Sequence, residues 1–177
     1  MGSGSRQNKI DELRQQIQPH LARYKVVFVD DETVTVKYFK KIFSKTLPAE
    51  VVGFTCGEDA LEYVTQQPSH CALILTDQLM PDMKGHELLD RCRIVAPKSF
   101  RMITSVLSIG YFSDEFETIH MPVVAKPWNI AHLNRFLLHG LEYFILRNDK
   151  VMQSQSEEFP DYKFQHWIDD LREDLNS

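Results

Sequence analysis

Acidic, hydroxyl and basic side chains stand directly after several short apolar runs of this sequence. The run "VVFV" is followed by Asp30 and Asp31, "ALILT" by Asp77, "MI" by Thr104 and "VVA" by Lys126. Carboxylates that lie close together repel one another, so such a cluster needs a cation. Oxygen ligands of this kind suit magnesium, which often joins carboxylates to a phosphate. A carboxylate can also attack phosphorus and form an aspartyl phosphate, whose oxygens an ammonium and a hydroxyl would stabilise.

These side chains can meet only if the apolar runs form neighbouring strands. Between residues 25 and 126, short β-branched runs alternate with stretches of helical periodicity, and continuous apolar runs suit a parallel sheet covered on both faces. The pattern predicts an α/β fold of the (βα)5 type, a doubly wound five-stranded parallel sheet. The predicted strands are Lys25–Val29, Glu50–Thr55, Ala72–Thr76, Arg101–Ser105 and Pro122–Ala125. The predicted helices are Thr33–Thr46, Glu58–Gln66, His86–Val95, Ser108–Thr118 and a closing helix from Asn129.

The carboxyl ends of parallel strands meet at one edge of a sheet, and ligands bind there where the strand order reverses. Each motif alone is better explained by a helix cap or a turn than by a binding site, because Asp is common at both. Capping alone does not account for an acid pair, an acid, a hydroxyl and a lysine at successive strand ends. The order of the motifs therefore favours a binding site over four unrelated caps.

Composition excludes several other classes of protein. The 177 residues are 43% hydrophobic, which is typical of a globular protein, and the net charge of -5 argues against a nucleic-acid-binding surface. The three cysteines, Cys56, Cys71 and Cys92, lack metal-binding spacing, and there is no signal peptide and no apolar run of membrane-spanning length. These features predict a reduced, cytoplasmic protein that does not associate with membranes.

The order and spacing of the motifs resemble the receiver (REC) domain of two-component response regulators, the phosphoacceptor modules of bacterial signalling. The resemblance runs from Tyr24 to Leu146 and includes "VVFVDDE", "GEDALEYV", "LILTDQLMPDMKGHELL", "MITS" and "AKPW". It implies the flavodoxin-like fold of the chemotaxis regulators and a signalling phosphoacceptor rather than an enzyme. The implied partner is a sensor histidine kinase or a phosphotransfer protein of a phosphorelay.

The resemblance also implies roles for individual residues. Asp77 would be the phosphorylated aspartate, Thr104 the switch hydroxyl and Lys126 the ammonium that pairs with the phosphoryl group. A Mg²⁺ or Mn²⁺ ion would be held by Asp30, Asp31, Asp77 and the backbone carbonyl of Leu79. The peptide bond before Pro127 is commonly cis in this family, and proline makes a cis bond accessible.

Three positions depart from the common family pattern. Val123 stands where many receivers carry an aromatic residue that moves on activation, and Phe100 or Tyr111 could substitute for it. Leu79 and Val106, which flank the path of the attacking water in family members, are both apolar here. A polar side chain could orient that water, so we expect slow dephosphorylation.

The two ends of the chain lie outside the resemblance. Residues 1–23 are interpreted as an expression remnant, "MGSGS", and a helix whose stripe of Ile10, Leu13 and Ile17 ends at Pro19. Residues 24–146 form the receiver, and residues 147–177 are a helical extension or linker that either leads to an output domain or packs on the receiver or a dimer partner. A heptad-like seam predicts homodimerisation through the last receiver helix; its members are Leu137, Leu141, Phe144, Asn148 and Val151.

Two other functions remain open at this stage. An aspartate-nucleophile phosphatase of the haloacid dehalogenase type would place a second Asp two residues after the nucleophile, where this chain has Leu79. Turnover of a phosphate ester would support that alternative. A receiver-like module could also bind partners without phosphate, although the intact set of Asp31, Asp77, Thr104 and Lys126 argues against it. A titration with magnesium and beryllofluoride distinguishes the two signalling alternatives.

Overall fold

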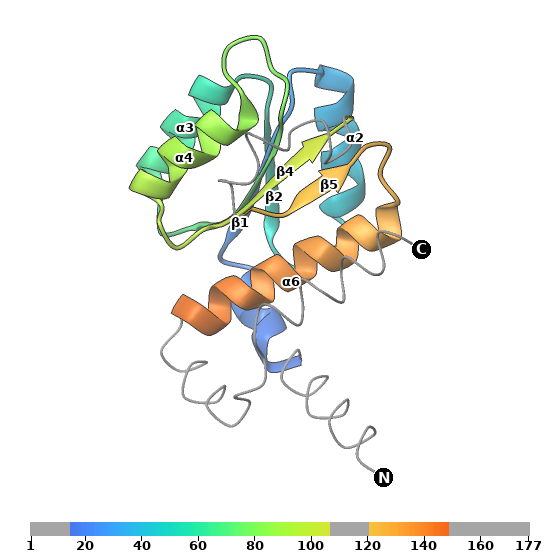
Figure 1. Ribbon diagram of the computed structural model, residues 1–177. Helices are drawn as coiled ribbons and strands as arrows, with labels where there is room; N and C mark the ends of the chain where they lie inside the picture. The colour runs from blue at the N-terminus through green and yellow to red at the C-terminus, as the bar shows by residue number, and fades with distance from the viewer. Residues whose placement is uncertain (1–14, 107–120, 149–177) are drawn as a thin grey trace.

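A computed structural model describes residues 15–106 and 121–148 of the chain. Its centre is a five-stranded sheet of order β2-β1-β3-β4-β5, in which every pairing is parallel (Figure 1). The strands are β1 (Lys25–Val29), β2 (Glu50–Phe54), β3 (Cys71–Asp77), β4 (Phe100–Ser105) and β5 (Val123–Ala125). The predicted fold class is confirmed, and the strand order reverses between β1 and β3, where such sheets bind ligands.

Helices cover both faces of this sheet, with α2 and α6 on one side and α3 and α4 on the other (Figure 1). Their bounds are α2 (Thr33–Phe43), α3 (Gly57–Gln66), α4 (Gly85–Val95) and α6 (Ile130–Asn148). Helix α2 ends before the predicted Thr46, because the chain tightens into a turn in which Lys45 N donates to Ile42 O at 3.2 Å and Thr46 N to Phe43 O at 3.3 Å. The predicted helix Ser108–Thr118 lies outside the described residues.

The core consists of two clusters, one on each face of the sheet. β3 is buried along its whole length, as expected for a central strand covered on both sides. On the α2 and α6 face, Phe28 and Phe39 stack with ring centroids 3.9 Å apart. On the α3 and α4 face, Val27 and Val29 contact the apolar stripes of both helices. This packing fixes the carboxyl ends of β1 and β3 relative to each other.

The predicted heptad seam of α6 is part of this core. Leu137, Leu141 and Phe144 are 0%, 0% and 3% exposed and pack against the sheet of the same chain. A coiled-coil seam and a core-facing helical stripe share nearly the same spacing, so the sequence could not separate them. The prediction that these three side chains form a dimer seam is therefore wrong, whereas dimerisation by another surface stays a prediction. Val151 lies outside the described residues.

The first described segment, residues 15–21, is helical and packs beneath α6. Pro19 was predicted to end this helix, but the helix continues to Leu21. Ile17 and Leu21 lie one turn apart and are each 1% exposed, so their burial holds the last turn in place. A proline removes only one backbone donor, which this packing outweighs. Ile10 and Leu13 lie outside the described residues.

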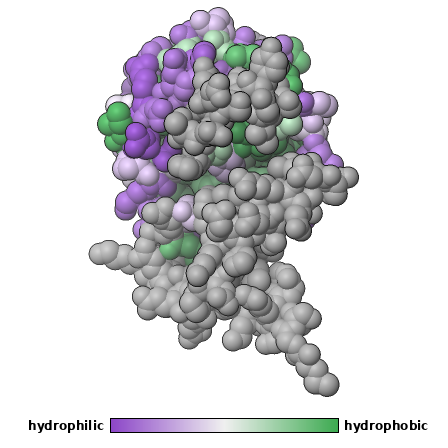
Figure 2. Space-filling view, in the orientation of Figure 1, coloured by the Kyte–Doolittle hydropathy of each residue, from purple (hydrophilic) through white to green (hydrophobic). Residues whose placement is uncertain are grey.

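The described surface shows both polar and apolar residues on the face drawn in Figure 2. Figure 2 shows hydrophobic residues as separate patches among hydrophilic ones in the upper part of the view. Large apolar side chains with substantial exposure are Val34, Tyr38, Leu79, Ile94 and Val106. Among the described helices, none is long and apolar enough to cross a membrane.

Candidate functional site

Four strands deliver the predicted polar residues to one edge of the sheet. Asp77 is the last residue of β3, and it pairs in register with Thr104 of β4. The ladder continues past the strand ends, since Asp30 N donates to Phe54 O at 3.1 Å and Lys126 N to Ser105 O at 2.8 Å. The backbone therefore holds these side chains at a fixed edge rather than on a free loop.

The Lys126 ammonium lies between two buried carboxylates. Its Nζ is 2.6 Å from Asp30 Oδ2 and 2.5 Å from Asp77 Oδ1. The remaining oxygens accept backbone hydrogen bonds, Asp30 Oδ1 from Glu32 N at 3.0 Å and Asp77 Oδ2 from Leu79 N at 2.7 Å. Each carboxylate thus has one charged and one neutral donor. The sequence-predicted residues Asp30, Asp77 and Lys126 are brought into direct contact.

Burial and ion pairing act in opposite directions at this edge. Burial raises the pKa of Asp30 above its ordinary value, although the Lys126 hydrogen bond and the Glu32 N–H oppose the change. Burial alone would lower the pKa of Lys126, but hydrogen bonds to Asp30 and Asp77 outweigh it and raise the pKa. The difference arises because Lys126 has two carboxylate partners whereas Asp30 has one ammonium. Lys126 therefore stays charged.

The acids at this edge fit a hard divalent cation in chemistry and charge. Asp30 and Asp77 share the single ammonium of Lys126, and Asp31 is exposed next to the buried Asp30. Carboxylate and carbonyl oxygens are the donors that magnesium prefers. Within residues 15–106 and 121–148, no three His, Cys, Asp or Glu side chains are already grouped around a common point. Lys126 takes up part of the space between Asp30 and Asp77, so the oxygen donors are present but not preassembled.

Thr104 has a partner that sequence reasoning missed. Its side chain is 0% exposed, and its Oγ1 accepts a hydrogen bond from the indole Nε1 of Trp128 at 2.7 Å. Trp128 follows the cis peptide bond between Lys126 and Pro127. The sequence showed only "KPW" at this point, and nothing in its spacing indicated a contact with a residue 24 positions earlier.

The structure also shows where the positions that depart from the family pattern lie. Val123 begins β5 and packs on the α3 and α4 face of the sheet. Phe100 cannot substitute for the missing aromatic residue, because it begins β4 at the opposite end of the strand from Thr104 and contacts Tyr143. Tyr111 lies outside the described residues. Leu79 and Val106 are 48% and 66% exposed, so both present apolar side chains to solvent.

Hydrogen bonds hold the loop after Asp77, residues 78–84, against the start of α3 and the start of α4. Asp82 accepts hydrogen bonds from Gly57 N at 2.6 Å and Glu58 N at 3.2 Å and so caps α3. Burial alone would raise the pKa of Asp82, but hydrogen bonds from the Cys56 thiol and these two N–H groups lower it. A carboxylate that caps a helix from 25 positions away is invisible in a local sequence window.

Gly85 closes the same loop against the end of β3. Its N–H donates to Gln78 O at 3.0 Å, and a Cβ at this position would lie 2.2 Å from Asp77 O. Gln78 is fully buried, and its side-chain amide contacts the ring nitrogen and the backbone N–H of His86. The backbones of β3 and α4 therefore approach each other so closely at Gly85 that any larger residue would have to push them apart.

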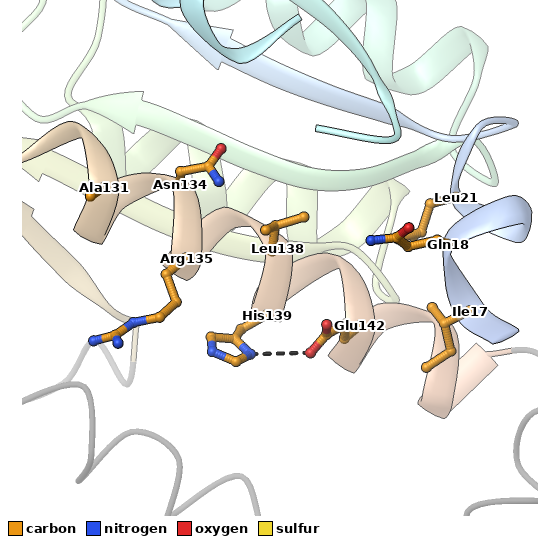
Figure 3. A pocket seen from close by; sticks show the side chains of 9 residues that line it. All are labelled: Ile17, Gln18, Leu21, Ala131, Asn134, Arg135, Leu138, His139 and Glu142. Carbon is orange, nitrogen blue, oxygen red and sulfur yellow. Dashed lines mark hydrogen bonds and ion pairs between the residues drawn. The ribbon is translucent and has the colours of Figure 1, made fainter. Parts of the chain in front are cut away.

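A hollow of about 200 Å³ lies between residues 15–21 and α6. Figure 3 shows Ile17 and Leu21 on one side and Leu138 on the other, with His139 facing Glu142. The His139 Nδ1 to Glu142 Oε2 distance is 3.1 Å. This hollow lacks the clustered acids of the sheet edge, so the sheet edge is the candidate site.

A parallel sheet of order 2-1-3-4-5 whose carboxyl edge carries acids and a lysine defines a receiver-like α/β domain. The response regulator receiver domain family matches residues 26–137, and the chain belongs to this family. It is thus a receiver domain of a two-component system, a signalling module rather than an enzyme. Receiver domains typically bind Mg²⁺ and work with a kinase partner. No curated protein matches the chain.

Several solved structures share the fold. A signal receiver domain of an HD domain-containing protein from Pseudomonas fluorescens is 19% identical, covers 73% of this chain and 94% of its own, and has a TM-score of 0.63. A CheY-like response regulator receiver domain protein from Methanospirillum hungatei is 21% identical over 70% of this chain and 98% of its own, with a TM-score of 0.63. A receiver domain protein from Clostridium thermocellum is 17% identical over 70% and 98%, with a TM-score of 0.63.

Proposed function

We propose that Asp77 accepts a phosphoryl group from the phosphohistidine of a sensor histidine kinase or a phosphotransfer protein. The observation that carries the proposal is the contact of Asp77 with Lys126 and with Leu79 N–H beside the second acid, Asp30. An Asp77 oxygen forms a bond to phosphorus while the bond from phosphorus to the histidine nitrogen breaks, and the imidazole leaves with the bonding electrons. The ammonium and the N–H group stabilise the negative charge that builds up on the phosphoryl oxygens.

The metal ion belongs to the same proposal. Asp30, Asp31, Asp77 and the carbonyl of Leu79 would hold Mg²⁺ or Mn²⁺, which supplies positive charge for the phosphoryl oxygens when it is bound. Lys126 neutralises only one of the three carboxylates, so the site without metal carries a surplus of negative charge that opposes a phosphate. The exposure of Asp31 leaves it accessible to the ion.

The output of the domain is proposed to follow α6. This helix begins at Ile130, two residues after the side chain that contacts Thr104. Phosphorylation adds charge of about -1.5 to -2 at pH 7 next to Thr104 and Lys126. A change at these two residues reaches the start of α6 through Trp128, and the helix carries it to a partner or an output domain.

Labelling with acetyl phosphate and magnesium tests the proposal. Wild-type protein should take up one phosphoryl group per chain, and Asp77→Asn should take up none, because the amide is not a nucleophile of this kind. Asp82→Asn is the matched control, since Asp82 is an acid of the same loop that faces α3. Stoichiometric labelling that persists in Asp77→Asn would refute the assignment.

A further inference from the structure

The Trp128 side chain connects Thr104 to the aromatic core beneath the sheet edge. Its ring packs edge-on against Phe28 and Phe39, with centroids 5.6 and 5.8 Å away. Lys126 Nζ lies 5.7 Å from the centre of the same ring. The indole is therefore held by packing on one side while its Nε1 contacts the Thr104 hydroxyl at 2.7 Å on the other.

Chemistry alone fixes the direction of this hydrogen bond. An indole N–H can only donate, so the Thr104 oxygen accepts and keeps its own O–H hydrogen for another partner. In the part of the chain that the structure describes, Trp128 is the only hydrogen-bond partner of the Thr104 hydroxyl. The side chain is 0% exposed, and a buried hydroxyl hydrogen without an acceptor is unfavourable. Among the described residues, the Thr104 O–H group is therefore a donor without an acceptor.

This donor stands beside the proposed phosphoacceptor. Thr104 and Asp77 pair in register on neighbouring strands, which lie about 4.8 Å apart in a sheet. Both oxygens of Asp77 already have donors, Lys126 Nζ and Leu79 N. A phosphoryl group on Asp77 would bring three further acceptor oxygens to this edge. One of these oxygens would then be an acceptor for the Thr104 hydroxyl.

We propose that Trp128 is a positioning residue that holds the Thr104 hydroxyl, by donating to its oxygen, in the orientation in which its hydrogen reaches a phosphoryl oxygen on Asp77. The inference rests on the proposed function of Asp77. Two hydrogen bonds in series polarise each other, so the indole also strengthens the Thr104 donor. Phenylalanine at position 128 would keep the ring packing but remove the N–H group.

Calorimetric titration with beryllofluoride, a phosphoryl mimic, tests this role. Each variant is titrated at the same magnesium concentration, and the affinities are compared. Trp128→Phe should bind about threefold to tenfold more weakly than the wild type, the value of one hydrogen bond. Thr104→Val should also bind more weakly. The double variant should bind no more weakly than Thr104→Val alone, because the indole acts only through the hydroxyl. A merely structural role of Trp128 would weaken binding in both backgrounds.

A second measurement observes the indole N–H group of Trp128 directly. The chain has two tryptophans, so two indole N–H signals are expected in a ¹⁵N spectrum, and Trp128→Phe identifies the one that belongs to Trp128. In Thr104→Val this signal should shift and exchange faster with solvent. In wild-type protein it should stay protected when beryllofluoride binds, because the indole bond persists.

The outcomes separate the two proposals. If wild-type protein does not bind beryllofluoride, the proposed function of Asp77 fails and the inference fails with it. If wild-type protein binds and Trp128→Phe binds equally well or more tightly, only the positioning role is refuted. Loss of indole protection on binding would also refute it, since the bond to Thr104 would then break in the phosphate-like state.

Discussion

Replacing Gly85 by alanine should damage the acceptor site through sterics alone. A Cβ at this position would lie 2.2 Å from Asp77 O and 3.0 Å from Gln78 Cα, and ordinary contact begins at 3.4 Å. The start of α4 and the end of β3 must therefore separate by about 1.2 Å, the difference between 3.4 and 2.2 Å. Both obstructing groups are backbone, so no side chain can rotate away.

The expected loss of stability follows from two opposing effects. Overpacking of this kind costs about 1–3 kcal/mol. Alanine at the first position of α4 recovers less than about 1 kcal/mol of helix propensity. The net loss of about 1–2 kcal/mol corresponds to a fall in Tm of roughly 2–8 °C for a chain of this length. Because the displaced backbone carries the nucleophile, a misplacement of about 1 Å should slow phosphorylation up to roughly 100-fold.

Gly140→Ala is the matched control. Its Cβ would lie 2.6 Å from Phe100 Cδ1 and 2.8 Å from Leu73 Cδ1, which are side-chain atoms remote from the sheet edge. Scanning calorimetry should show a loss of Tm for both variants, whereas acetyl phosphate labelling should slow only in Gly85→Ala. Labelling of Gly85→Ala at the wild-type rate, or equal slowing in Gly140→Ala, would refute the reasoning.

Three further predictions concern charge and solvent at the same edge. Lys126→Met should cost about 2–4 kcal/mol at pH 7 by leaving two carboxylates without a cation. Burial already raises the pKa of Asp30, so the folded variant binds more protons than the unfolded chain. Its urea midpoint should therefore be higher at pH 5 than at pH 7. Asp82→Ala should lose about 1 kcal/mol of cap stability at neutral pH. Since the pKa of Asp82 is lowered from 3.8, the difference from wild type should shrink below about pH 4, whereas a constant difference would contradict the cap. Leu79→Gln should speed loss of phosphate from Asp77 at least about fivefold, while Ile94→Gln, on the exposed face of α4, should leave the decay unchanged.

The convergence of polar residues at one edge was predictable because parallel strands have a direction. An apolar run that ends on Asp77 specifies both the strand and the end at which its acid lies, and the same holds for Asp30 and Lys126. The contacts of Lys126 with both acids follow once the strands are ordered. The pattern of apolar runs was therefore enough to predict most of the fold and the positions of these site residues.

Contacts between distant segments were not predictable in the same way. The cap that Asp82 provides for α3 and the bond from Trp128 to Thr104 join residues whose local patterns show no relation. The stripe on α6 was misread because a helix packed on a sheet and a helix in a coiled coil repeat apolar residues at similar intervals. Only the burial of Leu137 and Leu141 in the core distinguishes the two.

In the proposed output route, α6 would move as one body, because its apolar stripe of Leu137, Leu141 and Phe144 is buried against the sheet. Its 19 residues span about 28 Å at 1.5 Å per residue, from the neighbourhood of Trp128 to Asn148. A helix packed along a sheet shifts as a rigid rod, because tightly packed interiors deform little. A tilt of about 5° at its first turn would move its far end by about 2.5 Å. In the proposed output route, a sub-ångström change at the Thr104 hydroxyl would therefore appear as a displacement of about 2.5 Å at the far end of α6.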